Sequence, residues 1–468
     1  MQFLNRLVIP ESTEHLALLK YLLVLVTIMF VTYSSIALIA STVSALLNSL
    51  GRRERGREGG DKARAEHYLR FARDLASLAA PSKGVITALA ILPLVSSVLI
   101  YAQLLTGLRL GITTDMTLAS ILCVAGLFSV YYCKRSFEYG SIFSGFKRLS
   151  GGASNVEGAI DVETLGRKAL ATQRTSGRRG AILLWLGIWL YLGTTRLTFV
   201  TSHWDAPSFL SVLFSASTFL SLLNFAVSAI FITSAAVLFF FFTFENGIAI
   251  AASEDYKSYV KRFALPAGIV TVALEPLMIF LEIRNLPQTG LSNATFAIAG
   301  LGMFVALLVL IMFYNMSKYS AVNLGGYTFV GVILLVFVWA AKDEIAFNYA
   351  TRVQDQNLGV RYEAMLESLG EGKPQPVMSG EDIYNSRCSA CHRFDRKLVG
   401  PPYFMTLPHF VGKMDSLEDF ISNPYQAVAG YPPMPNQGLK PQEVKNVAEY
   451  IMGVYLSAKK AGTAKFTE

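Results

Sequence analysis

The residues best suited to chemistry are two cysteines and a histidine in the segment NSRCSACHRF: Cys388, Cys391 and His392. This C-x-x-C-H spacing is the one that attaches a c-type haem. On one helical turn the two thiols can add to the two porphyrin vinyl groups, and the adjacent imidazole then lies under the iron. The same residue types could bind zinc or act as a redox pair. Zinc would need a fourth ligand, and the sequence has no other cysteine in this region, so we expect one covalent haem c.

An iron held by His392 needs a second axial ligand from later in the chain, and Met434 in AGYPPMPNQ is the best candidate. The prolines around it predict a rigid, non-helical loop that can hold a thioether against the open face of the iron. Met405, Met414 and His409 compete for this position, although methionines more commonly fill cores. His/Met ligation raises the reduction potential and suits single-electron transfer rather than oxygen binding.

The surrounding sequence resembles the class I cytochromes c across residues 379–457. The resemblance rests on SGEDIYNSRCSACH, LVGPPY, DFISNP, GYPPMPNQ and PQEVKNVAEYI, which follow one another in that order. It implies that Gly400, Pro401 and Pro402 form the loop near the proximal histidine and that Tyr450 packs on the closing helix; ordinary loop and core roles are the alternatives. The closing helix is also predicted directly, because a proline suits its first turn and apolar residues recur on one face.

The composition of the rest of the chain excludes a soluble single-domain enzyme. Of the 468 residues, 53% are hydrophobic and only 16% are charged, with a mean hydropathy of +0.43, whereas about 25% of residues are charged in ordinary soluble domains. Four cysteines are too few for a disulfide scaffold. The net charge is +8, and the basic residues lie between hydrophobic runs. We therefore expect membrane contacts and no nucleic-acid partner.

Eight long apolar runs predict membrane-spanning helices, since about 20 apolar residues cross a bilayer. The runs lie near 17–47, 84–106, 114–133, 180–200, 209–243, 263–283, 294–314 and 324–341. The predicted fold is all-α: a polytopic membrane helical bundle over residues 1–342, a linker over 343–375, and a small class I cytochrome c domain over 376–468. The start of the chain lacks the pattern of a cleaved secretory signal, so the first span is expected to act as the insertion signal.

Basic residues predict the orientation, because loops rich in Lys and Arg stay cytoplasmic. The connections that follow spans 1, 3, 5 and 7 carry 22 Lys and Arg residues. The N-terminal tail and the other three connections, on the opposite side, carry four. This asymmetry predicts an outside N-terminus, and eight crossings then return the chain to the outside. Haem attachment outside the cytoplasmic membrane, a feature of the cytochrome c family, agrees with it. We therefore expect a bacterial inner-membrane protein with its N-terminus and haem domain in the periplasm.

The membrane helices are similar to the large subunit of the bd-type oxidase superfamily, particularly members with a C-terminal cytochrome c. The similarity rests on the eight spans, on LAILPLVSSVLIYAQLL and YYCKRSF, and on the Leu-Pro exit of the sixth span. The chain departs from that pattern where relatives carry ligand histidines: the first span has FVTYSS and the fifth has Asn224 in FLSLLNF. His15, His67 and His203 lie at or beyond helix ends. These features disfavour further haem b or d, or quinone, in the membrane domain.

Glu275, before a proline in the sixth span, is the ionisable group that most needs an explanation. A carboxylate there costs about 2.5 kcal/mol or more unless it is paired, neutral or facing water. A proton path, a quinone contact and a hydrogen-bonded carboxylic acid are the three interpretations. Glu282, near the exit of the same span, needs no such role, and Cys123 and Cys133 are expected to be packing residues.

The sequence thus predicts a membrane-anchored c-type cytochrome that transfers single electrons on the periplasmic side as a subunit of a respiratory complex. Its haem domain carries ten Lys and Arg against nine Asp and Glu, a balance that disfavours electrostatic steering of a charged carrier and favours a fixed or apolar redox partner. A catalytic subunit of a bd-like oxidoreductase, with more haem or quinone in the membrane, is the enzyme alternative. A scaffold with a redox-sensing haem is a third.

Overall fold

A computed structural model describes residues 12–105, 112–149, 157–199, 213–244, 252–368, 378–426, 428, 430–432 and 434–463. The described part of the chain is helical without strands, as the sequence predicts. It forms two compact units, which contain residues 13–355 and 356–468. Each unit is described by itself.

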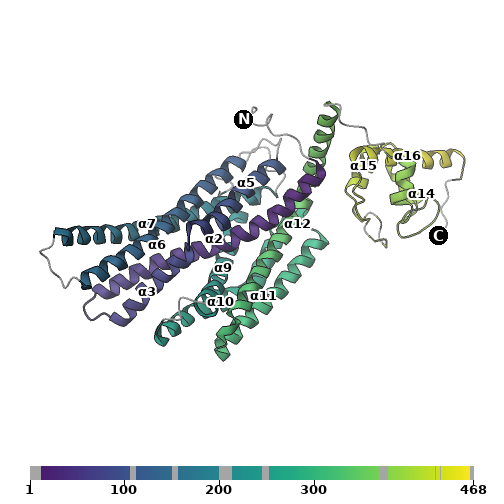
Figure 1. The fold of residues 1–468 in the computed structure, drawn as a ribbon. Coiled ribbons are helices and arrows are strands. Elements are labelled where there is room, and N and C mark those ends of the chain that lie inside the picture. The colour runs from purple at the N-terminus through teal and green to yellow at the C-terminus, as the bar shows by residue number, and fades with distance from the viewer. Residues whose placement is uncertain are drawn as a thin grey trace. The chain divides into compact units, whose positions relative to one another are not determined.

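The first unit is a bundle of long apolar helices (Figure 1). Seven helical stretches among the described residues are long and apolar enough to cross a membrane: Thr13–Gly56, Lys83–Leu104, Ile112–Gly140, Thr164–Leu197, Ala216–Thr243, Glu254–Arg284 and Asn293–Tyr319. They match seven of the eight predicted spans. The eighth, 324–341, falls in the first part of α12 (Gly325–Ser368), which is not among the seven and continues into charged residues. That crossing stays a prediction.

Several helices extend well beyond a bilayer. Helix α2 (Thr13–Gly56) has 44 residues, which is about 66 Å at 1.5 Å per residue, roughly twice the thickness of the hydrocarbon core. The other elements of this unit are α3 (Lys62–Ala79), α4 (Lys83–Ile86), η1 (Thr87–Ile91), α5 (Leu92–Leu104), α6 (Ile112–Leu149), α7 (Glu157–Leu197), α9 (Ala216–Leu238), η3 (Phe239–Thr243), α10 (Glu254–Arg284), η4 (Gln288–Gly290), α11 (Asn293–Tyr319) and η5 (Val322–Leu324). The basic connections predicted at 48–83 and 134–179 are therefore largely helical where the structure describes them.

Serine side chains set the starts of four of these helices. Ser82, Ser215, Ser253 and Ser292 each accept a hydrogen bond from the backbone N–H three residues later. Such a cap satisfies one of the N–H groups that a helix leaves free at its first turn. Short polar signals in the sequence thus fix the ends of long apolar runs.

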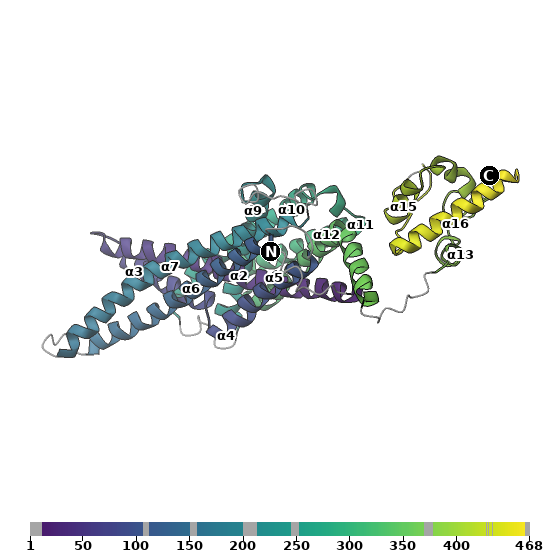
Figure 2. The same ribbon diagram turned by 90° about the horizontal axis from the view of Figure 1, so that it is seen from above.

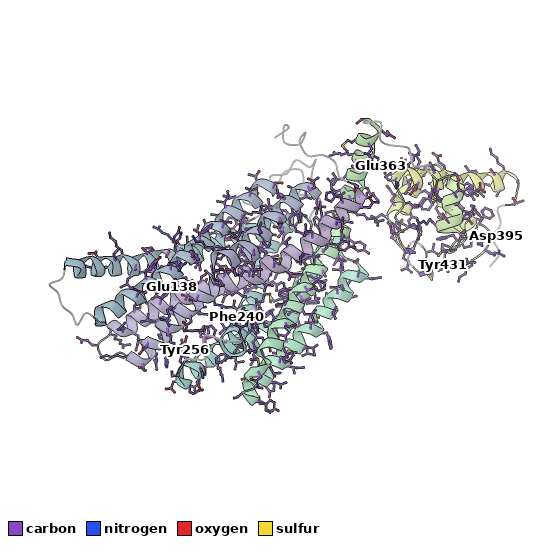
Figure 3. All side chains as sticks on the ribbon, in the orientation of Figure 1. Glu138, Phe240, Tyr256, Glu363, Asp395 and Tyr431 are labelled. Carbon is purple, nitrogen blue, oxygen red and sulfur yellow. The ribbon has the colours of Figure 1, made fainter. Side chains whose placement is uncertain are left out.

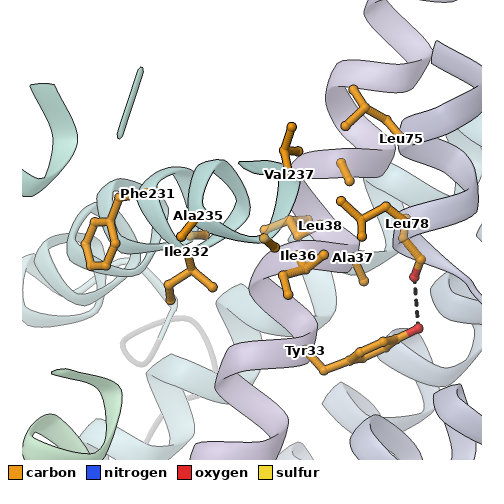
Figure 4. Close-up of a cluster of buried hydrophobic side chains, with 14 of the residues drawn as sticks. Tyr33, Ile36, Ala37, Leu38, Leu75, Leu78, Phe231, Ile232, Ala235 and Val237 are labelled. Carbon is orange, nitrogen blue, oxygen red and sulfur yellow. Dashed lines mark hydrogen bonds between the residues drawn. The ribbon is translucent and has the colours of Figure 1, made fainter. Parts of the chain in front are cut away.

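The core of this unit lies where α2 meets α3 and α9. Figure 4 shows Leu75 and Leu78 of α3 and Val237 of α9 beside Ile36–Leu38 of α2, all of them buried. Tyr33 in the same cluster donates a hydrogen bond of 2.9 Å to the Ala79 carbonyl. Small and aliphatic residues let the helices approach closely, which is how helices associate in a membrane.

Helices α6 and α7 run side by side over most of their length (Figure 1 and Figure 2). Cys123 and Cys133 of α6 are buried in this contact, and Cys133 lies 3.4 Å from the Gln173 carbonyl. A Cβ added at Gly187 would come within 2.6 Å of the Cys123 sulfur. The two cysteines therefore occupy the helix contact as packing residues.

The second unit packs short helices around one apolar core. After the last turns of α12 come α13 (Gly380–Ile383), η6 (Tyr384–Cys388), α14 (Tyr403–Thr406), η7 (Leu407–Phe410), α15 (Met414–Ser422) and α16 (Pro441–Lys460). The predicted closing helix is α16, and it packs against α13 and α15 (Figure 2). Val444, Val447 and Ile451 line its buried face. Residues 343–368 of the predicted linker are helical, and 369–377 lie outside the described residues.

Candidate functional site

The C-x-x-C-H segment lies where the first helical stretch of the second unit ends. Ser379 caps α13 by accepting from the Asp382 N–H, and the stretch then widens into the π-helical turn η6, which ends at Cys388. The N–H groups of Cys391 and His392 both donate to the Cys388 carbonyl, at 3.1 and 2.9 Å. Cys388 is buried and Cys391 is half-buried. This local turn brings both thiols and the imidazole together on consecutive positions.

The His392 imidazole is held in one orientation. Its Nδ1 lies 3.0 Å from the Pro401 carbonyl oxygen, which can only accept, so Nδ1 carries the proton and Nε2 keeps a free lone pair. The Tyr403 ring stacks on the imidazole with centroids 4.9 Å apart and planes within 4°. Burial lowers the pKa of His392 below its usual value of 6.5, which favours the neutral ring that a metal ion requires.

Gly400 makes room for that ring. Its N–H donates to the Cys391 carbonyl at 2.8 Å, which ties the loop to the C-x-x-C-H turn. A Cβ added at Gly400 would overlap the His392 imidazole and lie 2.7 Å from both ring nitrogens. Only a glycine allows this approach without movement of the ring. The loop thus lies beside His392, with Gly400 and Pro401 in direct contact with the imidazole.

Met434 lies half-buried in a segment without regular secondary structure that precedes α16. Asn436 anchors this segment, because its side-chain amide donates to the Ser422 carbonyl and its side-chain oxygen accepts from the Gly438 N–H. Among the competing ligands, Met405 and His409 are exposed, while Met414 packs against the core of the unit. Burial therefore favours Met434 and Met414 over the other two.

Tyrosines surround the turn, and two of them were not singled out from the sequence. Tyr384 donates a hydrogen bond of 3.3 Å to the His392 carbonyl, and Tyr403 contacts both the imidazole and the Cys388 thiol. Tyr450 of α16 places its ring 5.8 Å from that of Tyr384. A tyrosine directly after Pro-Pro in LVGPPY was the available signal for Tyr403. Figure 3 labels Tyr431, whose ring lies 4.9 Å from the Lys397 ammonium in this unit.

The membrane unit holds a buried charge cluster that the sequence did not reveal. Glu282 was set aside as a residue near the exit of a span, but it is buried, 6% exposed, and ion-paired with Arg196 and Lys342. The Lys342 ammonium lies 2.7 Å from one Glu282 oxygen, and Arg196 contacts the other and also donates to Ser221 at 2.6 Å. The interpretation of Glu282 is therefore corrected: it is the centre of this cluster, because two cations from α7 and α12 converge on it.

Glu275 and the histidines of this unit are placed differently. Glu275 is fully buried two helical turns before Glu282 on α10, with Ser228 of α9 3.4 Å from one carboxyl oxygen. His15 is exposed at the start of α2, and His67 stacks on Tyr259 with ring centroids 5.5 Å apart. His203 lies outside the described residues.

Comparisons with known proteins match the second unit. Residues 375–451 match the family model for cytochrome c oxidase, cbb3-type, subunit III. Cytochrome c-551 of Stutzerimonas stutzeri is 33% identical over 96 residues, which covers 19% of this chain and 92% of that protein. Cytochrome c-551 of Ectopseudomonas mendocina is 35% identical over 78 residues, which covers 16% of this chain and 95% of that protein. No solved structure matches the chain.

These relatives are small proteins that the chain covers almost completely, so the match extends over a whole cytochrome. It agrees with the fixed imidazole, the C-x-x-C-H turn and the apolar core of the second unit. The similarity of the membrane helices to bd-type oxidases is not shown by these matches. The chain belongs, through its C-terminal domain, to the class I cytochromes c.

Proposed function

We propose that this chain is a membrane-anchored cytochrome that transfers single electrons on the periplasmic side, as a subunit of a respiratory complex. The observation that carries the proposal is the hydrogen bond between His392 Nδ1 and the Pro401 carbonyl. Such an outer partner fixes the ring and leaves Nε2 as the ligand, an arrangement typical of metal-binding histidines. It is present beside two thiols at the spacing for covalent attachment.

The residues fit one haem c. Cys388 and Cys391 would bind it covalently, His392 would supply one axial ligand, and Met434 would supply the other. The bound haem would provide a one-electron redox couple, with a potential raised by His/Met ligation. The protein orients the imidazole through Pro401 and Tyr403 and keeps the Cys388 side of the turn out of water.

The distribution of charged residues along the chain supports the proposed periplasmic side and the proposed respiratory partner. Twenty-two Lys and Arg on one set of loops against four on the other predict that the chain ends outside, if the apolar part of α12 crosses the membrane as an eighth span. The near balance of ten basic and nine acidic residues in the haem domain gives no strong field for capturing a charged carrier. A permanently associated partner within a membrane complex suits such a surface.

The first experiment is a pyridine haemochrome spectrum of the purified full-length chain, with a haem stain after denaturing electrophoresis. One haem c per chain, retained after denaturation, is the expected result. No stain would overturn the proposal. Haem b or d in addition to haem c would favour the alternative, a catalytic subunit of a bd-like oxidoreductase with haem or quinone in the membrane domain. The buried carboxyl group of Glu275, for which a quinone contact is one interpretation, is the feature of the membrane unit that favours this alternative.

The second experiment tests orientation and partner. A reporter that is active only outside the cytoplasm, fused after residue 468, is expected to be active, and a reporter in the 48–83 connection is expected to be inactive. The reverse pattern would reject the periplasmic assignment. Purification from the native membrane is expected to bring down other respiratory subunits, and reduction of the haem by their substrate would follow electron transfer directly.

A further inference from the structure

The membrane unit contains a carboxyl group that the haem does not use. Glu275 is 0% exposed in the last third of α10, and one of its carboxyl oxygens, Oε1, has no hydrogen-bond partner. Pro276 follows it and has no N–H, so the carbonyl of Val272 loses its helical partner one turn away. A polar group that is both buried and unpartnered calls for a bound species, because interior polar groups are otherwise hydrogen-bonded.

Polar side chains lead from Glu275 to the charge cluster. Ser228 Oγ lies 3.4 Å from Glu275 Oε2, and Asn224, one turn before Ser228 on α9, hydrogen-bonds to Glu282 through its side-chain amide. The Asn224 side-chain oxygen is itself buried without a partner. Glu282 then contacts Lys342 and Arg196. The groups facing Glu275 from the packed helices are thus Ser228 and Asn224 of α9, Glu282 of its own helix and Lys342 of α12.

The contacts of Ser228 indicate which group carries a proton. Its hydroxyl lies 2.7 Å from the Asn224 main-chain oxygen and 3.4 Å from Glu275 Oε2. A serine hydroxyl has one proton, and a carbonyl oxygen can only accept, so the shorter contact uses that proton. The longer contact is then satisfied by a proton on Glu275 itself, which donates to the serine oxygen. This arrangement suits a neutral carboxylic acid that can exchange its proton through Ser228.

The position of the charge cluster also indicates which side of the membrane the polar path reaches. Arg196 lies one residue before the end of α7, Glu282 two residues before the end of α10, and Lys342 directly after the predicted eighth span. All three lie at the end of an even-numbered span, which the charge asymmetry assigns to the outer side. Glu275 is seven residues deeper than Glu282, or about 10 Å along the helix. The polar path therefore leads from the outer surface partway into the membrane.

We propose that Glu275 is a proton-binding site that exchanges protons with the outer aqueous phase through Ser228, Asn224 and the Glu282–Lys342–Arg196 cluster. The ligand is the proton, carried by water along this path. On the inner side of Glu275, the buried residues Val272, Leu265 and Ala264 of α10 are apolar, and the Thr271 hydroxyl donates to the Ala267 carbonyl of its own helix. It serves proton binding or release near the middle of the membrane unit, and its operation does not depend on the haem.

The test is infrared spectroscopy of the full-length chain in lipid vesicles, in water and in D₂O. We expect a carboxylic-acid C=O band that is missing in Glu275→Gln and that shifts in wild type soon after transfer to D₂O. Ser228→Ala is expected to slow that exchange about tenfold, the factor for one lost hydrogen bond. Ser41→Ala, another buried serine that donates to a backbone carbonyl in its own helix, is the matched control and is expected to leave the exchange rate unchanged.

Three results would overturn the proposal. The first is a wild-type spectrum whose carboxylic-acid region equals that of Glu275→Gln, since the group would then be ionised. The second is a Glu275 band that does not exchange with D₂O over hours, because a sealed acid is structural. The third is a Glu275 band that is lost when the pH is raised on the inner side of oriented vesicles but not when it is raised on the outer side. If Glu275→Gln fails to fold, Glu275→Asp, which keeps a carboxyl group, assigns the band through its change in frequency. The Cys388→Ser/Cys391→Ser variant is expected to keep the band, which separates this proposal from the haem assignment.

Discussion

The two units of this chain build polar sites by opposite routes. In the haem domain, Cys388, Cys391 and His392 are contiguous, and the loop that fixes the imidazole follows within nine residues. In the membrane unit, the Glu282 cluster draws its cations from α7 and α12, 86 and 60 residues away in sequence. The first site is a property of one short segment, whereas the second exists only when the helices pack.

This difference has an energetic consequence. The neutral imidazole of His392 needs one carbonyl and one aromatic neighbour, so the haem turn carries little buried charge. Glu282, Arg196 and Lys342 are buried charges that would each be costly alone, and they are tolerated because they compensate one another. The membrane cluster is therefore a place where a single substitution affects the whole unit, and the haem turn is a place where a substitution affects the cofactor.

The strongest test of this separation removes the haem attachment. Cys388→Ser with Cys391→Ser is expected to abolish the covalent haem stain completely, because the thioether bonds cannot form. The thermal unfolding of the membrane unit in detergent is expected to stay as in wild type. Cys133→Ser, which keeps a donor near the Gln173 carbonyl in α6, is the matched control and is expected to stain normally. Loss of the membrane unit's folding with the haem would show that the two units are not independent.

The converse test removes the centre of the charge cluster. Glu282→Gln leaves Arg196 without its carboxylate, and we expect a loss of about 3–5 kcal/mol in stability, the cost of breaking a buried pair. Asp343 remains 3.1 Å from the Lys342 ammonium and still compensates its charge, which reduces the loss of stability at Lys342. Any folded protein is expected to retain the haem c spectrum. Glu254→Gln, on the exposed start of the same helix, is expected to leave the unfolding temperature nearly unchanged; equal effects of the two substitutions would contradict the assignment.

Exchange of the second axial ligand tests the haem site alone. Met434→His is expected to lower the reduction potential by roughly 0.1 V or more, within the ~0.8 V range over which axial ligands set haem potentials. Met405→Leu, at an exposed position, is the control and is expected to leave the potential unchanged. The measurement is a spectroelectrochemical titration. A shift with Met405 or Met414 variants, and none with Met434, would move the ligand assignment to the competing methionine.

The features that could be predicted from the sequence are those made by residues close together in the chain. Seven of eight spans followed from apolar runs, and their starts at Ser82, Ser215, Ser253 and Ser292 follow a capping rule that acts over three residues. The C-x-x-C-H motif and the closing helix were predictable for the same reason. The roles of Gly400 and Pro401 came from family resemblance, and the structure gives them a contact with His392.

Features made by packing between distant helices were not predictable. Glu282 appeared ordinary because its position near a span end suggested solvent, and only the approach of α7 and α12 shows that it is buried. Helix α12 also continues past the apolar run to Ser368, because its polar residues do not break a helix even where they end a membrane span. Hydropathy reports where a helix leaves the lipid, not where it ends.

The smallest effect distinguishes a glycine required by the haem site from one that is not. Gly400→Ala adds a methyl group against the His392 ring, and we expect a loss of about 1–3 kcal/mol, typical of overpacking. Gly453→Ala on α16 meets no atom within 4 Å and is expected to stabilise the domain by about 0.5–1 kcal/mol, because alanine is the better helix former. Thermal unfolding followed at the haem absorbance measures both. Stability changes of opposite sign for the two substitutions would show that Gly400 is required by its contact with the imidazole. A Gly400→Ala variant of unchanged stability would mean that the imidazole has room to move and that Pro401 alone does not fix it.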